Sequence, residues 1–207
     1  MRRLFEYGGI IASCILICAG AVSIAVGALG IVQVRDQLAA EKIEGSPDMT
    51  PTAIRAGAEE AGLDVSTLDI PDMAVAGRTI DTGAEAHAFA GYLRIHALEA
   101  TGGQVYAEMG RFLDEAGNPT NDEAAAAKGP ETGAPVPNQA RNLWVTATAL
   151  STALHTAFFA ERVGIFSIAI GATLLLVGIG FLVLTLGGAL RRAPAARQAN
   201  DTVAQAA

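Results

Sequence analysis

The sequence contains few of the residues that most often carry chemistry. Its 207 residues include two cysteines, three histidines and one tryptophan, and aromatic residues make up 5% of the chain. Both cysteines, Cys14 and Cys18, lie inside one uncharged apolar run, so the rest of the chain has no disulfide. They are one helical turn apart and share a face, but two sulfurs make an incomplete metal site. We therefore interpret them as small packing residues.

Motifs that mark enzymes and cofactor sites are missing as well. The chain contains no G-x-S-x-G nucleophile elbow, no H-E-x-x-H zinc motif and no C-x-x-C-H haem motif. It has no glycine-rich phosphate loop, since "ATGGQ" is too short to form one. These absences favour a protein that is not an enzyme, and we expect neither a cofactor nor a bound metal.

Charged residues are absent from two long runs, 7–34 and 163–190. Each run has 28 residues and no proline, whereas a helix needs about 20 residues to cross a bilayer. We therefore expect two transmembrane helices in the cell membrane. A cleaved signal peptide is the alternative for the first run, but the apolar part of a signal peptide is typically about 7–15 residues long.

Basic residues at both ends predict the orientation in the membrane. Two arginines precede the first run and three follow the second. Short ends that carry arginine stay in the cytoplasm. Residues 1–6 and the tail 191–207, which we expect to be disordered, should therefore be cytoplasmic. The segment 35–162 should then be extracytoplasmic.

The segment 35–162 is strongly acidic. It carries nine basic and nineteen acidic residues, which gives a formal net charge of −10. Electrostatic repulsion therefore excludes nucleic acid and anionic lipid as charge-driven partners of this segment.

A capping box predicts the start of one long helix in this segment. Thr82 and Glu85 have the spacing at which each side chain bonds the backbone amide of the other. The helix should run to about Leu113. Gly102 and Gly103 lie inside it, and each costs about 1 kcal/mol relative to alanine, so the helix either breaks there or packs against bare backbone.

Further caps predict three more helices. Thr50, which precedes a proline, marks the start of a short helix. Thr120 and Glu123 repeat the capping-box pattern, and Asn138 caps a helix that should continue to Leu190. The expected fold is all-α, with two transmembrane helices extended outward into an extracytoplasmic three- or four-helix bundle.

Small residues recur every seven positions in both apolar runs. The first stripe comprises Ser13, Gly20 and Gly27, and the second comprises Gly164, Gly171 and Gly178. Seven residues turn a helix to within roughly 20° of two full turns, so each stripe lies on one face. Such stripes let membrane helices approach closely. The partner of each stripe is either the other run or a different protein, unless the spacing merely reflects the 23 glycines of the chain.

Polar residues of the types that bind ligands or take part in catalysis occur in the 94–112 region and elsewhere in the segment 35–162. They are Tyr92, Arg94, His96, Glu99, Tyr106 and His155. His96 and Glu99 are three residues apart and share a helix face, from which they should bond across to the last helix. We interpret the set as a structural network between helices. Partner binding is one alternative, and a metal site of His96, Glu99 and His155 is another.

Four segments resemble a group of two-pass membrane proteins from actinobacteria. They are "DQLAAEKIEGSPDMTP" (36–51), "HALEATGG" (96–103), "YAEMGRF" (106–112) and "ARNLWVTATALSTAL" (140–154). The resemblance covers most of the chain. Some members of that group are labelled as aromatic ring-opening dioxygenase, alpha-subunit type. The resemblance implies a two-pass layout and transfers no iron ligand or catalytic residue to this sequence.

The sequence is compatible with three functions. The first is a non-enzymatic accessory or scaffold protein of the cell envelope, which sits in the lipid bilayer and acts through helix packing with a membrane-protein partner or a second copy. The second is an extracytoplasmic ligand-sensing domain that signals through a partner. The third is a metal-dependent enzyme that uses His96, Glu99 and His155.

Overall fold

The computed structural model describes residues 2–187, which are mostly helical. The end of the second apolar run and the expected tail 191–207 lie outside the described residues. The elements are α1 (Arg2–Ala40), α2 (Pro51–Glu60), the 3-10 helix η1 (Val65–Thr67), α3 (Gly83–Ala100), β1 (Phe112–Leu113), β2 (Pro119–Thr120) and α4 (Gln139–Leu186). They form two compact units: unit 1 consists of the residues up to 30 and from 163 onward, and unit 2 of residues 31–162.

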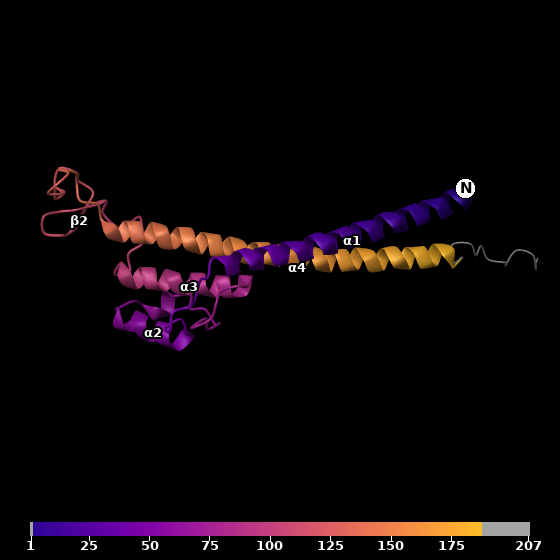
Figure 1. Cartoon of the computed structure of the whole chain (residues 1–207), viewed down its shortest axis with the longest axis horizontal. Helices are drawn as coiled ribbons and strands as arrows, with labels where there is room; N and C mark the ends of the chain where they lie inside the picture. Colours follow the sequence, from indigo (N-terminus) through magenta and orange to yellow (C-terminus); the bar gives the residue numbers. More distant parts are fainter. Residues whose placement is uncertain (1, 188–207) are drawn as a thin grey trace, which may run out of the picture. The chain divides into compact units, whose positions relative to one another are not determined.

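The two longest helices, α1 and α4, contain the two apolar runs. Each includes an 18-residue stretch with a mean hydropathy of 2.5, and each is long and apolar enough to cross a membrane. Within unit 1 the two helices pack against each other in antiparallel order, because Gly20 meets Gly171 and Gly27 meets Gly164 (Figure 1). The prediction of two long apolar helices is confirmed.

Unit 2 is built in helical layers, with α3 between α4 and α2 (Figure 1). The caps predicted at Thr50 and Thr82 are both present, and the Thr82–Glu85 capping box forms both of its hydrogen bonds. The larger side chains of the main core come from α1, α2, α3, α4 and the intervening loops: Leu38, Met49, Ile54, Val75, Ile80, Phe89, Tyr92, Ile95 and Leu154. Correct capping therefore sets which face of α3 enters this core.

Helix α3 ends at Ala100, so the prediction that it continues to about Leu113 is wrong. Gly102 and Gly103 have φ angles of +62° and +79°, in the left-handed region that favours glycine. The amide of Gly103 donates to the carbonyl of Leu98 (2.8 Å), and the Gly102 amide donates to the carbonyl of Glu99 (3.3 Å). These two bonds make a Schellman motif, which satisfies the last carbonyls of the helix and turns the chain away.

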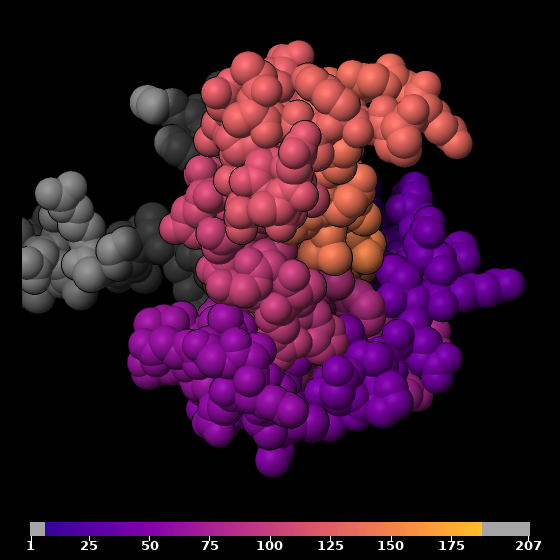
Figure 2. All heavy atoms as spheres, turned by 90° about the vertical axis from the view of Figure 1, so that its left-hand side faces the viewer, coloured from indigo at the N-terminus to yellow at the C-terminus, as the bar shows by residue number. Residues whose placement is uncertain are grey.

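The segment between α3 and α4 contains a small hairpin, and the short helix predicted from Thr120 and Glu123 does not form. Strands β1 and β2 pair in antiparallel register, and isolated bridges join Asp114 to Ala126 and Lys128 to Pro135. These pairings use the backbone groups that a helix would need. Figure 2 shows the loops of this segment (pink to salmon) above α2 (purple), with part of α4 (orange) exposed between them.

Candidate functional site

Glycines bring α1 and α4 into backbone contact in unit 1. A Cβ atom on Gly20 would lie 2.6 Å from the carbonyl oxygen of Gly171, and a Cβ on Gly27 would lie 2.6 Å from that of Gly164. A Cβ on Gly178 would lie 2.8 Å from the Cγ1 atom and 3.0 Å from the backbone nitrogen of Ile17 on α1. Because no side chain fits at such a distance, the two stripes mesh only as long as these positions remain glycine.

Small polar residues extend the same contact, although the sequence pattern did not point to most of them. Ser23 donates through Oγ to the carbonyl of Ser167 (2.8 Å), which joins α1 to α4. Ser13 is fully buried, and its Oγ donates to the Gly9 carbonyl on its own helix (2.7 Å). Thr185 is 2% exposed and contacts Gly9. Thr185 could have been found, because it continues the second stripe by one more step of seven.

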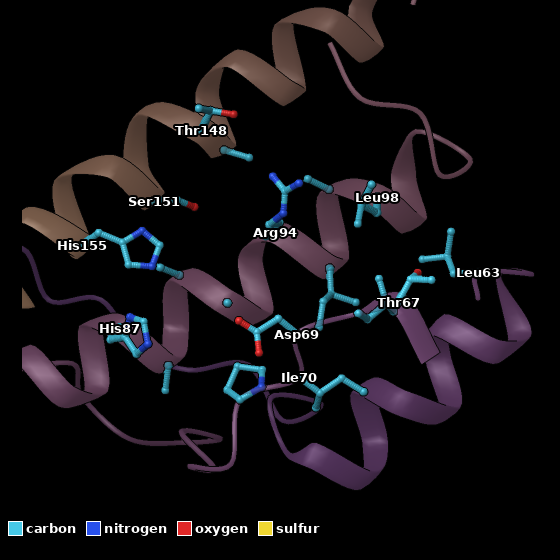
Figure 3. A pocket seen from close by; sticks show the side chains of 18 of the residues that line it. Leu63, Thr67, Asp69, Ile70, His87, Arg94, Leu98, Thr148, Ser151 and His155 are labelled. Carbon is cyan, nitrogen blue, oxygen red and sulfur yellow. The ribbon is translucent and has the colours of Figure 1, made fainter. Parts of the chain in front are cut away.

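A groove of about 1040 Å³ lies in unit 2 (Figure 3). Its floor is the face of α3 that the other layers leave open, one wall is α4, and the other wall is the segment 62–73. Arg94, Ser151 and His155 line the side toward α4, and Asp69 lines the opposite wall. The volume is at the upper end of the usual range for ligand pockets, about 300–1,000 Å³.

Aromatic side chains hold the cationic and imidazole groups of this groove. The guanidinium carbon of Arg94 lies 5.4 Å from the ring centroid of Trp144. His87 stacks on Phe158 with 4.6 Å between ring centroids, and His155 meets His87 edge-on at 5.1 Å. Burial, and secondly the neighbouring His87, lower the pKa of His155. The His155 ring therefore favours its neutral form, in which one nitrogen can accept a hydrogen bond.

The polar residues singled out in the sequence lie in several separate places. The hydroxyl of Tyr92, which is fully buried, donates to the carbonyl of Met73 (3.1 Å) and so fixes a groove wall to α3. Tyr106 lies beyond the end of α3, where the guanidinium of Arg141 is 4.0 Å from its ring centroid. His155 lies in the groove, and the structure does not bring it to the other two candidate metal ligands.

His96 and Glu99 do share a face of α3, but this face is turned toward α2 and the loop before it. His96 Nε2 lies 3.1 Å from Asp48 Oδ2, without the alignment of a hydrogen bond. Glu99 Oε1 is buried, has no hydrogen-bond partner among residues 2–187, and packs against Gly57 of α2. The expected bonds from this pair to the last helix are therefore not made in the described part of the chain.

We expect Glu99→Gln to stabilise the protein at neutral pH. Burial raises the pKa of Glu99, and His96 offsets part of the shift, so the fold favours the neutral carboxyl. Because the pKa of Glu99 is higher in the folded than in the unfolded protein, protonation of this carboxyl stabilises the fold. This stabilisation is complete at pH values below the unfolded-state pKa and is lost as the pH rises through the folded-state pKa. Removing the charge should therefore raise the free energy of unfolding at pH 7 by about 1 kcal/mol.

Urea unfolding of both proteins at pH 7 and at pH 4 tests this expectation. The gain of the glutamine variant should be present at pH 7 and vanish at pH 4, where the native carboxyl is already protonated. Glu59→Gln, an exposed position on α2, is the matched control and should show no gain. A loss of stability at pH 7 would mean that the ionised carboxylate holds the fold together.

A buried carboxylate that no sequence pattern indicated connects three helices of unit 2. Glu161 on α4 is 7% exposed. Its Oε1 accepts from Nη2 of Arg35 on α1 (2.6 Å), and its Oε2 accepts from the amide of Gly83 at the start of α3. A negative charge at a helix N-terminus is favourable, because unpaired amides and the helix dipole both point toward it. No local pattern in the sequence marks this link, since its partners are 126 and 78 residues away.

Within residues 2–187 no group of three or more His, Cys, Asp or Glu residues is placed to hold a metal ion. The main features of the described residues are therefore a glycine-packed helix pair and an acidic helical unit with a large groove. Comparison of the chain with known protein families, with curated proteins and with solved structures gave no match.

Proposed function

We propose that this protein is a two-pass integral membrane protein. Its apolar helices would cross the membrane, the 35–162 segment would form an extracytoplasmic helical bundle, and both termini would lie in the cytoplasm. The supporting observation is that large apolar side chains cover the outer faces of the helix pair in unit 1. Among the most exposed are Ile11, Ile15, Val22, Val26, Leu29, Phe166, Leu176, Val183 and Leu186. Apolar surface of this extent is unfavourable in water, and lipid chains would cover it.

Within the membrane we assign the protein an accessory or scaffold function, without catalysis, in the cell envelope. It would act through helix packing with a membrane-protein partner or a second copy. Gly8, Gly30 and Gly180 support this proposal, because each has open space where a side chain would be. They leave outward faces on which another helix can approach closely.

Labelling of single cysteines in intact cells tests the topology. In a background with Cys14→Ser and Cys18→Ser, cysteine at Ser46 or Ala134 should react with a membrane-impermeant thiol reagent. Cysteine at Gln198 should react only after the membrane is opened, because the arginines near both chain ends should keep those ends in the cytoplasm. The reverse pattern would overturn the proposed orientation.

The same cells test the accessory function. A tagged full-length chain, purified from their membranes in a mild non-ionic detergent, should bring down a second copy or one membrane protein in a fixed ratio. Gly180→Leu, which fills an outward-facing position, should weaken that association if this face is used. Recovery of the chain alone, as a monomer, would count against a scaffold function.

A further inference from the structure

The groove of unit 2 has opposite charges on its two sides, and these charges are not paired with each other. Arg94 rises from α3 on the side toward α4, and Asp69 stands on the wall formed by the 62–73 segment (Figure 3). Both side chains are exposed, and neither takes part in an ion pair within residues 2–187. In a unit of net charge −10, an arginine that faces an open groove without a carboxylate partner is available to an external anion.

Hydroxyl groups strengthen the anion-binding character of the α4 side. Thr152 and Thr156 donate their hydroxyls to the carbonyls four residues earlier on α4. Thr148 and Ser151, which point into the groove near Arg94, make no such side-chain bond in the described chain (Figure 3). Two free hydroxyl donors beside a guanidinium are the groups that bind a carboxylate in proteins.

The acidic wall offers the complementary group, and apolar side chains also line the groove. Asp69 has no described hydrogen-bond donor, so its carboxylate is free to accept bonds from an ammonium group. Leu63, Ile70 and Leu98 also line the groove, to the side of or beyond the two charged groups (Figure 3), and all three are only half-buried. A ligand that fits must therefore carry an anion, a cation and an apolar body.

We propose that the groove binds short apolar peptides with free ends. The peptide carboxylate lies against Arg94, Thr148 and Ser151, its ammonium group lies against Asp69, and its side chains cover the apolar part of the groove. The volume of about 1040 Å³ suits a ligand of a few residues better than a single ion. This inference adds a binding activity to the proposed membrane function and does not depend on it.

Three forms of one tripeptide, Leu-Ala-Leu, test the proposal. The free peptide carries both charges, the N-acetylated form keeps only the carboxylate, and the C-terminal amide keeps only the ammonium group. Binding is measured by calorimetry on the full chain in neutral lipid nanodiscs, and by the fluorescence of Trp144, the single tryptophan, which lines the groove. The free peptide should bind about tenfold more tightly than either blocked form, because each blocked form loses one charge-assisted contact.

Two variants assign each end of the peptide to its side chain. Arg94→Gln should lower the affinity for the free peptide to the affinity that the native protein has for the peptide amide. In both cases the contact between Arg94 and the peptide carboxylate is missing. Asp69→Asn should lower the affinity for the free peptide to that of the acetylated form. Because these variants lie on different walls, a folding defect in one, checked by circular dichroism, leaves the other as an independent test. Arg55→Gln on α2, outside the groove, is the matched control and should bind as the native protein does.

Several results would overturn the proposal. One is that the free peptide does not bind to the native protein. Another is that all three forms bind equally, since the charged walls would then recognise neither end. A third is that Arg55→Gln lowers the affinity as much as Arg94→Gln, which would reduce the effect to the overall charge of the unit.

Discussion

Gly171→Leu should separate the two apolar helices of unit 1. A Cβ atom at this position would lie 2.7 Å from the carbonyl oxygen of Gly20 and 2.9 Å from the amide nitrogen of Ile24. Both atoms belong to backbone, which cannot move aside as a flexible side chain can. A leucine should therefore cost about 3 kcal/mol or more, at the upper end of overpacking penalties, and force the helices apart.

A disulfide between the helices measures this separation. Ser23→Cys and Ser167→Cys place two thiols where a serine side chain of α1 contacts α4, in a background without the native cysteines. The pair should oxidise readily in the parent protein and poorly after Gly171→Leu, as read by mass spectrometry of digested protein. Gly180→Leu, on the same helix but with open space around it, should leave the crosslink intact.

Equal crosslinking in the two leucine variants would show that the glycine contact does not hold the helices together. Leu175 is outside the seven-residue stripe of α4, but it also lies at the interface with α1. Its Cβ would lie 3.0 Å from a Cβ on Gly20, so a substitution there also changes the interface.

Glu161→Ala should cause the largest loss of stability among single changes at polar residues of unit 2. The change leaves the Gly83 amide at the start of α3 without its acceptor, and it removes the buried partner of Arg35. A buried donor that loses its partner costs about 1–3 kcal/mol, and the carboxylate at the helix N-terminus contributes further. We expect a loss of about 3 kcal/mol in the free energy of unfolding.

The contribution of the ion pair can be separated from that of the helix cap. The side chain of Arg35 is 51% exposed, so solvent screens its charge and Arg35→Gln should cost about 1 kcal/mol or less. Urea unfolding followed by the fluorescence of Trp144 reports on unit 2. Glu59→Ala, at an exposed position of α2, is the control. If Arg35→Gln costs as much as Glu161→Ala, the link between α1 and α4 matters more than the cap of α3.

The sequence by itself determined the features that depend on neighbours within one or two helical turns. The bonds of a capping box join residues three apart, so Thr82 and Glu85 could be assigned without any knowledge of the fold. A run of 28 uncharged residues predicts a long apolar helix, and two such helices are present. The seven-residue stripes placed their small residues on one face of each helix for the same reason, because helical periodicity is a local property.

Local rules also reached their limit at the end of α3. The Gly102–Gly103 pair left two outcomes open, a break or a helix packed on bare backbone. Two consecutive left-handed residues closed a Schellman motif, which ended the helix and separated Tyr106 from His96 and Glu99. The Thr120 pattern was overridden in a similar way, because pairing with β1 took the backbone groups that a helix would have used.

Only the tertiary structure decided which residues meet across the chain. Glu161 joins partners 126 and 78 residues away, His155 lies beside His87, and Asp48 reaches His96. The groove has the same origin, because its floor and walls come from three separate segments that no spacing rule connects. Such contacts depend on how the helical layers pack, and not on helical periodicity or on the secondary-structure propensity of single residues. The sequence alone could therefore identify polar residues of the types that bind ligands or take part in catalysis. It could not determine which of them share a surface.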